Sequence, residues 1–145
     1  MLKGSCLCGD VRYELDAPLG MIGICHCSRC RKSSGTAYAV NATVDQAGFR
    51  LVAGAASLAE FASLPGVTRF FCRRCGSPLY SRRDSTPDAL RLRLGTLDTP
   101  IAERPAFHFF VASMAEWDFI HDDLPRSPER PQDPAALAPG RRTTP

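Results

Sequence analysis

The 145-residue sequence predicts a small, mainly β protein built from antiparallel strands. Its apolar segments are short, and β-branched and aromatic side chains are frequent in them. Gly, Pro or Asp stands in most of the gaps between these segments, which is typical of strands joined by turns. Little of the sequence has the apolar spacing of an amphipathic helix. The length suits one domain with a core of its own.

The expected strands follow one another along the chain. V-R-Y-E-L at 11–15 alternates between apolar and polar residues, and L-R-L-R-L at 90–94 does so more regularly. Segment 57–63 fits a strand or a helix, and we interpret it as a strand. The other segments with strand character are 21–25, 38–44, 49–52, 67–72 and 107–111.

The composition changes near the C-terminus. Six of the twelve prolines lie in the last 21 residues, and the chain ends in P-G-R-R-T-T-P. We therefore expect a folded domain at 1–123 and a Pro-rich tail at 124–145 that is extended or disordered. No apolar run approaches the ~20 residues that span a bilayer, and the N-terminus lacks the apolar core of a signal peptide. We expect a cytoplasmic protein that does not associate with membranes.

The seven cysteines lie in three places, C-L-C at 6–8, C-H-C-S-R-C at 25–30 and C-R-R-C-G at 72–76. An odd number in tight clusters argues against a complete set of disulfides, and a bridge across a single residue is strained. In a reducing compartment, clustered cysteines favour metal binding. In extended chain, residues i and i+2 face the same side, so C-x-C presents two sulfurs together. C-x-x-C followed by Gly76 is the tight turn found at zinc sites.

Seven ligands divide into four and three. A structural zinc is closed by four cysteines, whereas a catalytic zinc keeps three protein ligands and one open position. We expect two zinc ions, a structural one bound by Cys6, Cys8, Cys72 and Cys75 and a catalytic one bound by Cys25, Cys27 and Cys30. The spacing leaves other pairings open, as well as a fourth ligand from His26, His108 or His121.

The formal charge of +3 is weak support for nucleic-acid binding. It counts the cysteines as neutral thiols, whereas metal-bound cysteines are thiolates. Seven thiolates with two Zn²⁺ ions carry a net charge that cancels this formal value. We therefore expect no nucleic-acid partner, although the tail and the stretch after Cys30 remain locally basic.

Three segments resemble the motifs of the glutathione-dependent formaldehyde-activating enzyme family, G-S-C-L-C-G-D-V-R-Y at 4–13, C-H-C-S-R-C-R-K-S-S-G at 25–35 and F-F-C-R-R-C-G-S-P-L-Y at 70–80. P-A-F-H-F-F-V-A-S at 105–113, with Trp117 and D-D-L-P at 122–125, is similar to the closing segment of that family. The resemblance implies a zinc-binding β-tent fold and a carbon–sulfur lyase type of activity on glutathione adducts of formaldehyde or related thiol adducts. Some members of the family, similar to a vertebrate centromere protein, are studied for chromosome or cytoskeletal roles.

A zinc ion held by Cys25, Cys27 and Cys30 is expected to bind a thiol rather than to activate water. Three thiolates make the metal electron-rich and a poor Lewis acid, but they leave room for a fourth sulfur. Glutathione also carries carboxylates. Arg31 and Lys32, with Arg29 nearby, could attract these groups, and Ser34 could donate a hydrogen bond. The same cations could equally balance the charge of the thiolates.

The histidines and aromatic residues nearby predict structural roles. His26 alternates with Cys25 and Cys27, so on an extended chain it points away from the metal, and we expect it to form a hydrogen bond. We expect His108 to be a core histidine with satisfied hydrogen bonds, and Trp117 and Phe109 to belong to the core.

Two functions of different class follow from these observations. The first is an enzyme that acts on thiol adducts at the three-cysteine zinc. The alternative is a non-catalytic zinc module that binds a protein or nucleic-acid partner. A thiol that binds at one of two zinc ions would support the enzyme, and a salt-sensitive interaction with nucleic acid would support the module.

Overall fold

A computed structural model describes residues 1–133 of the chain. The described chain forms two compact units. Unit 1 comprises residues 1–20 and 41–103, and unit 2 comprises residues 21–40 and the described residues from 104 onward. Most of the tail expected at 124–145 lies outside the described residues.

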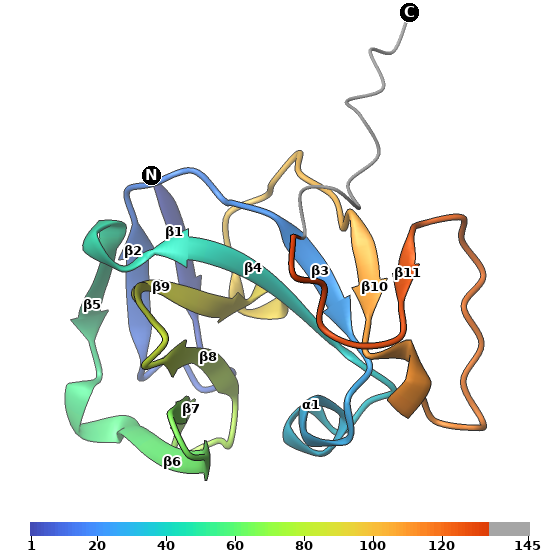
Figure 1. Cartoon of the computed structure of the whole chain (residues 1–145). Helices are drawn as coiled ribbons and strands as arrows, with labels where there is room; N and C mark the ends of the chain where they lie inside the picture. Colours follow the sequence, from blue (N-terminus) through green and yellow to red (C-terminus); the bar gives the residue numbers. More distant parts are fainter. Residues whose placement is uncertain (134–145) are drawn as a thin grey trace, which may run out of the picture. The chain divides into compact units, whose positions relative to one another are not determined.

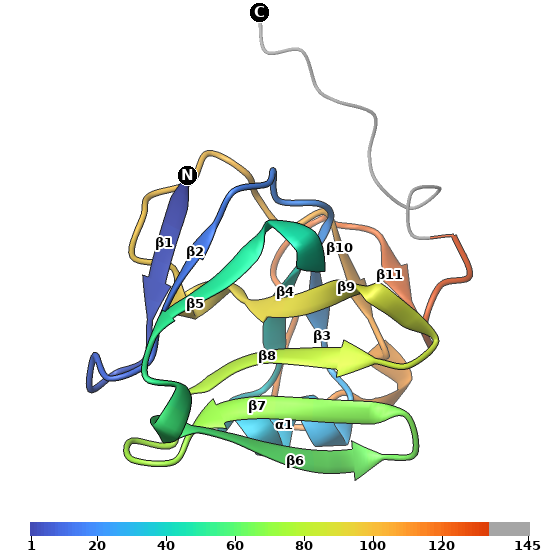
Figure 2. The ribbon, with the colours of Figure 1, turned by 90° about the vertical axis from the view of Figure 1, so that its left-hand side faces the viewer.

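Unit 1 consists of antiparallel strands. β1 (Leu2–Ser5), β2 (Arg12–Leu15) and β5 (Phe49–Ala53) form a three-stranded sheet in the order β1-β2-β5. A second group runs in the order β4-β9-β8-β7-β6, and Figure 2 shows β8, β7 and β6 one below another. The bounds of these strands are Ala39–Asp45 for β4, Leu58–Leu64 for β6, Val67–Cys72 for β7, Pro78–Arg83 for β8 and Thr86–Arg93 for β9. Three short 3₁₀ turns connect strands at Gln46–Gly48 (η1), Ala55–Ser57 (η2) and Leu94–Thr96 (η3).

The core of unit 1 explains why these segments form strands. Tyr13 and Leu15 alternate with exposed or half-buried residues along β2, and both side chains are buried. Leu90 and Leu92 alternate in the same way on β9. Each fully buried side chain of this size contributes about 1.5–3 kcal/mol. The hydroxyl of Tyr13 lies 2.8 Å from the hydroxyl of Thr96, so its polar end is also satisfied.

Unit 2 is smaller and its strands are parallel. β10 (Phe107–Phe109) pairs with β3 (Ile22–Cys25) on one side and with β11 (Arg126–Ser127) on the other, as Figure 1 shows. Helix α1 (Ser28–Ser34) follows β3, and a 3₁₀ turn at Val111–Ser113 (η4) follows β10. A Cβ atom on Gly23 would lie 2.9 Å from the ring of Phe107, so this glycine lets the aromatic rings of β10 pack closely on β3.

The mainly β prediction is confirmed, and every expected strand is present. Segment 57–63, interpreted as a strand, corresponds to β6. Strands β1, β8 and β11 and helix α1 were not predicted from the sequence. The prediction of extended chain and loop at residues 25–30 is wrong, because Cys30 lies in the first turn of α1.

The chain also continues in regular pairing beyond the expected domain end at 123. β11 pairs with β10 through residues 126–127. The N–H of His108 donates to the carbonyl of Pro125 at 2.8 Å, and the N–H of Ala112 donates to that of Pro128 at 3.2 Å. The first residues of the Pro-rich segment therefore belong to unit 2.

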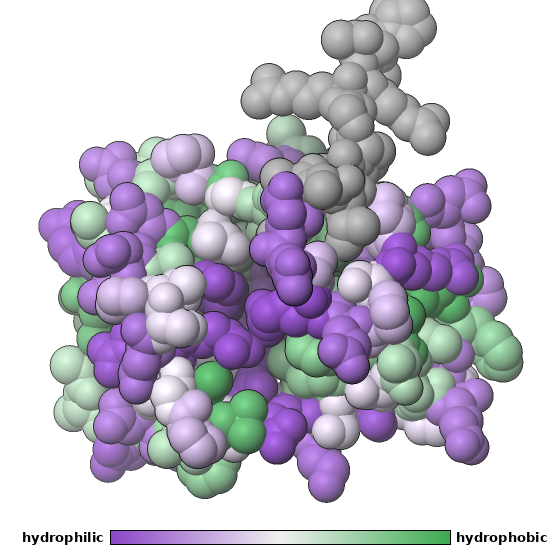
Figure 3. All heavy atoms as spheres, in the orientation of Figure 1, coloured by the Kyte–Doolittle hydropathy of each residue, from purple (hydrophilic) through white to green (hydrophobic). Residues whose placement is uncertain are grey.

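The helices of the described chain are short, with seven residues in α1 and three in each 3₁₀ helix. None of these helices is long and apolar enough to cross a bilayer. On the face drawn in Figure 3, hydrophilic and hydrophobic side chains are interspersed.

Candidate metal centres

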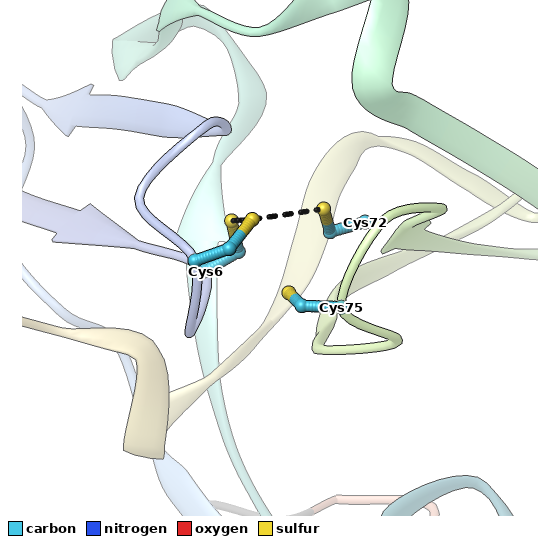
Figure 4. A group of neighbouring side chains, drawn as sticks. Cys6, Cys72 and Cys75 are labelled. Atoms are coloured by element: carbon cyan, nitrogen blue, oxygen red, sulfur yellow. Dashed lines mark hydrogen bonds between the residues drawn. The ribbon is translucent and has the colours of Figure 1, made fainter.

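Four cysteine sulfurs gather in unit 1. Cys6 and Cys8 lie on the turn between β1 and β2, whereas Cys72 ends β7 and Cys75 lies on the turn before β8. All four sulfurs lie within 4.8 Å of one another. Those of Cys6 and Cys8 are 3.5 Å apart, and those of Cys8 and Cys72 are 3.8 Å apart. Figure 4 shows the side chains of Cys6, Cys72 and Cys75 pointing toward a common space.

Two similar turns bring these sulfurs together. Gly9 follows Cys8 and Gly76 follows Cys75, and both glycines have a φ of 77°. This left-handed conformation is easy for glycine and strained for other residues. The N–H of Gly9 donates to the carbonyl of Cys6 at 3.0 Å, and that of Gly76 donates to the carbonyl of Cys72 at 2.8 Å. Each turn therefore folds back on its own first cysteine.

Contacts around the sulfurs hold the two turns to each other. The N–H of Leu7 donates to the hydroxyl of Ser77 at 2.9 Å. The guanidinium of Arg74 lies 2.8 Å from the carboxylate of Asp10, and this pair lowers the pKa of Asp10. Hydrogen bonding to the side chain and then to the backbone of Ser77 lowers the pKa of the Cys75 thiol to about 5. Such contacts around ligands orient them and stabilise the thiolate form.

The geometry of this group fits a zinc ion. All seven cysteines are free thiols, so the sulfurs are not bridged in pairs. Four sulfurs at the usual zinc–sulfur distance of about 2.3 Å lie about 3.8 Å apart in a tetrahedron. The two separations of 3.5 and 3.8 Å are close to this value. Cys6, Cys8, Cys72 and Cys75 could therefore hold one metal ion.

Three further sulfurs gather in unit 2. Cys25 is the last residue of β3, Cys27 is the N-cap of α1, and Cys30 lies one turn into that helix. The N–H of Cys30 donates to the sulfur of Cys27 at 3.4 Å, so the helix start itself places two of the sulfurs side by side. All three lie within 4.8 Å of one another. His26, His108 and His121 stand outside both groups.

The three sulfurs lie close enough to repel one another if all of them are ionised. The neighbouring Cys27 and Cys30 side chains raise the pKa of Cys25, and burial raises it further. Three thiolates at this distance repel one another unless a positive charge lies among them. A divalent metal supplies such a charge and deprotonates coordinating thiols. The donor set of Cys25, Cys27 and Cys30 therefore also fits a zinc ion.

Apolar side chains surround the group of three. Cys25 and Cys30 are buried in one cluster with Ala39, Phe107 and Phe109. The side chains of Met21, Cys27, Ala106 and Phe110 pack against that cluster. An environment of this kind excludes water and strengthens electrostatic interactions within it.

A chain of three polar side chains, of which the two histidines are buried, begins at His26 between Cys25 and Cys27. The Nε2 atom of His26 is 2.8 Å from Nδ1 of His108, and both side chains are buried. Nε2 of His108 is 3.1 Å from both carboxylate oxygens of Asp122. The N–H of Leu124 and then His108 lower the pKa of Asp122. The predicted hydrogen bond of His26 and the predicted core position of His108 are confirmed.

The residues expected to bind substrate lie on α1. Arg31 donates from a guanidinium nitrogen to the carbonyl of Ser113 at 3.3 Å, and its Nε is buried with no partner among the described residues. Lys32 is exposed, and Ser34 is the last residue of the helix. Ser34 lies four residues after Cys30, which places both on one side of the helix. A role of Arg31, Lys32 and Ser34 in binding stays a prediction.

The aromatic residues were predicted with mixed success. Phe109 is buried, as expected, with 8% of its surface exposed. Trp117 is 68% exposed, so its expected place in the core is wrong. It lies in a polar loop between two carboxylates, Glu116 and Asp118, where no alternating pattern holds it against a sheet.

No role was predicted from the sequence for Asp122 or Arg130. Asp122 binds His108, and the guanidinium of Arg130 lies over the rings of Phe109 and Phe110. The D-D-L-P segment at 122–125 gave a signal for Asp122, because an aspartate before a turn often accepts a backbone N–H. Arg130 lies in the stretch expected to be a tail.

Comparisons with known proteins identify the family of this chain. The sequence profile of the family described as glutathione-dependent formaldehyde-activating enzyme matches residues 1–113. A Halomonas elongata protein with the provisional name glutathione-dependent formaldehyde-activating enzyme is 31% identical over an alignment of 125 residues, and the match covers 81% of this chain and 79% of the relative. A crystal structure of a Rhodobacter sphaeroides protein superposes with a TM-score of 0.60 at 29% identity, covering 71% of this chain and 97% of the other. The chain belongs to the glutathione-dependent formaldehyde-activating enzyme family.

Proposed function

We propose that this protein is a zinc-dependent enzyme of the carbon–sulfur lyase type that acts on the glutathione adduct of formaldehyde or a related thiol adduct. The main support for this proposal is that one group has four cysteine sulfurs and the other has three. Four sulfurs complete a structural zinc site, whereas three leave one position for a substrate. Within residues 1–133, no fourth cysteine, histidine or carboxylate joins Cys25, Cys27 and Cys30.

The roles of the two groups follow from their positions. Cys6, Cys8, Cys72 and Cys75 join segments far apart in the sequence, so we assign them a structural zinc. Cys25, Cys27 and Cys30 lie close together at the junction of β3 and α1, so their zinc would cross-link little chain. A zinc ion at this second group would hold a substrate sulfur as a thiolate.

The proposed reaction makes or breaks one carbon–sulfur bond. In the direction of synthesis, the thiol loses its proton and its sulfur bonds to the carbonyl carbon of formaldehyde. The π electrons of the carbonyl move to the oxygen, which takes up one proton, so the thiol and formaldehyde together give the hydroxymethyl adduct. In the reverse direction the carbon–sulfur bond breaks, its electron pair leaves with the sulfur, and the hydroxyl proton is released as the carbonyl forms. The apolar side chains around the three sulfurs limit access of water to the reacting atoms.

The chain's own residues would orient the thiol. Cys25, Cys27 and Cys30 fix where the substrate sulfur lies. The cations of Arg31 and Lys32 are available on the same short helix for the carboxylates of glutathione, and Ser34 offers a hydroxyl. All seven cysteines are free, which suits the reducing cytoplasm, where we expect the protein to act.

The test is the rate at which formaldehyde and glutathione exchange with their adduct. Exchange spectroscopy by NMR measures this rate at equilibrium, with and without zinc-loaded protein. We expect the wild-type protein to accelerate exchange and Cys27→Ser to lose the acceleration. Ser28→Ala is the matched control, because Ser28 is the exposed neighbour of Cys27. Binding of glutathione without any acceleration of exchange would favour a binding module over an enzyme.

A further inference from the structure

Arg130 has a defined position beside the three-cysteine group, although it lies in the Pro-rich segment. β11 pairs with β10, and the chain after β11 stays attached to the residues after β10. The N–H of Ala112 donates to the carbonyl of Pro128 at 3.2 Å, and that of Phe110 donates to the carbonyl of Glu129 at 3.4 Å. These bonds fix the backbone up to the residue before Arg130.

The guanidinium of Arg130 lies over two aromatic rings. Its central carbon is 5.4 Å from the ring centre of Phe109 and 5.6 Å from that of Phe110. Both distances are within the range of an attractive cation–π interaction. Phe109 is buried with Cys25 and Cys30, and Phe110 packs against the same cluster. Arg130 therefore covers two aromatic side chains, Phe109 and Phe110, that pack with the three-cysteine group.

The backbone at Phe110 supports this placement. Its φ of 57° and ψ of 36° are left-handed, and it is the sole non-glycine residue with a positive φ in the described chain. A bulky side chain in this region is strained, so surrounding contacts must hold it there. Phe109 and Phe110 lie 5.6 Å apart between ring centres, and Arg130 lies over both.

The charge of Arg130 is not neutralised within the part of the chain that the structure describes. Its guanidinium forms no ion pair and no hydrogen bond there, in contrast with Arg31, which donates to Ser113. A guanidinium that uses its face on an aromatic ring keeps the N–H groups at its edge for an anion. Arg130 is exposed, so an anion in solution can reach it.

We propose that Arg130 binds a carboxylate of the thiol whose sulfur occupies the three-cysteine group. This inference rests on the proposed function and specifies the substrate class as a thiol that bears a carboxylate. The C-terminal segment would thereby select anionic thiols over neutral ones.

The test compares two thiols and three variants on zinc-loaded, full-length protein by isothermal titration calorimetry. Glutathione carries carboxylates, and β-mercaptoethanol carries none. For Arg130→Ala we expect glutathione affinity to fall by about ten- to a hundredfold, as for a lost hydrogen bond between charged groups. We expect the affinity for β-mercaptoethanol to stay unchanged. Arg130→Lys keeps the charge without the paired N–H groups, so it should recover part of the loss.

Arg126→Ala is the matched control, because Arg126 lies on the same segment and the change removes the same charge. Its guanidinium donates to the carbonyl of Asp122, and we expect both affinities to stay unchanged in this variant. An equal loss of affinity for both thiols in Arg130→Ala and Arg130→Lys would mean that Arg130 supports the fold, and it would overturn the inference. An unchanged affinity for glutathione would also overturn the inference, while leaving the proposed function intact. If the wild-type protein binds neither thiol, the proposed function fails and the inference with it.

Discussion

Nε2 of His26 lies 2.8 Å from Nδ1 of His108, and this contact determines which atoms of both rings carry a proton. Nε2 of His108 faces the carboxylate of Asp122, so it must be the N–H donor there. In a neutral His108 ring, Nδ1 is then an acceptor, and Nε2 of His26 donates to it. His26 lies between Cys25 and Cys27, and its backbone N–H donates to the backbone carbonyl of Phe109 at 3.0 Å. The pair of rings therefore fixes the backbone that carries two sulfurs.

Replacing His108 by Phe should destabilise the protein through His26. The buried ring N–H at Nε2 of His26 would lose its acceptor, which costs about 1–3 kcal/mol of folding free energy. We expect a lower midpoint of urea unfolding and weaker zinc retention at the three-cysteine group. His121→Phe is the control, because His121 is exposed. An unfolding midpoint for His108→Phe equal to that of His121→Phe would show that the contact does not contribute.

The protonation of His26 should depend on pH in a specific direction. Burial and then the neighbouring His108 lower the pKa of His26 from its ordinary value near 6.5. Below that pH the unfolded chain binds a proton that the folded protein does not, so the free energy of unfolding falls as the pH drops. It continues to fall until the pH reaches the folded pKa.

An NMR titration of the His26 ring measures this directly. The folded protein should show a His26 midpoint below 6.5, with zinc content monitored at each pH so that metal loss is recognised. A midpoint at or above that value would contradict burial of a neutral ring.

The turn glycine Gly76 should matter for its backbone conformation alone. A Cβ at Gly76 would meet no atom within 4 Å, but φ there is 77°. Gly76→Ala should therefore destabilise unit 1 by about 1 kcal/mol through strain at Cys75. Gly95 has equally open space without a positive φ, so Gly95→Ala should change the unfolding free energy little. Equal effects in chemical unfolding would remove the conformational argument.

Much of the fold was predictable because strands of alternating pattern are specified locally. Val11, Tyr13 and Leu15 mark one buried face, and Leu90, Leu92 and their neighbours mark another. β8 was missed because it opens with Pro78 and carries Arg82 and Arg83, although proline is allowed at the first residue of a strand. α1 was missed because it is seven residues long and is capped by the side chain of Cys27, not by Ser or Asp. Gly35 at its end, in the left-handed conformation, was an available signal.

The two sulfur groups were partly predictable, because the spacing of the cysteines in the sequence limits which sulfurs can bind one metal ion. C-x-C and C-x-x-C turns present sulfurs in pairs, and the structure brings them into the expected groups of four and three. The environment of the second group was less accessible to sequence reasoning. Asp122 and Arg130 are far from Cys25 in the sequence, and only the parallel pairing of β11 with β10 and β10 with β3 brings these segments into one unit. Pairing between distant segments leaves no local signal.

The two sulfur groups should differ in their effect on folding. A metal at the first group joins Cys8 to Cys72 across 64 residues, whereas Cys25 and Cys30 are only five residues apart. The loop-closure entropy differs by about 2 kcal/mol between spans of these lengths, and binding of a structural zinc contributes directly to folding. We expect Cys75→Ser to be poorly soluble or unfolded. Cys27→Ser should keep the β-sheet signal in circular dichroism.

The count of zinc ions per chain tests the central claim most directly. Native mass spectrometry of the zinc-loaded wild-type protein should find one zinc for each of the two groups, and Cys27→Ser should retain one of them. A chelator should remove the zinc bound by three cysteines first, because that site has one protein ligand fewer. A single zinc in the loaded wild-type protein, or two zinc ions released together, would contradict the division into a structural and a catalytic site.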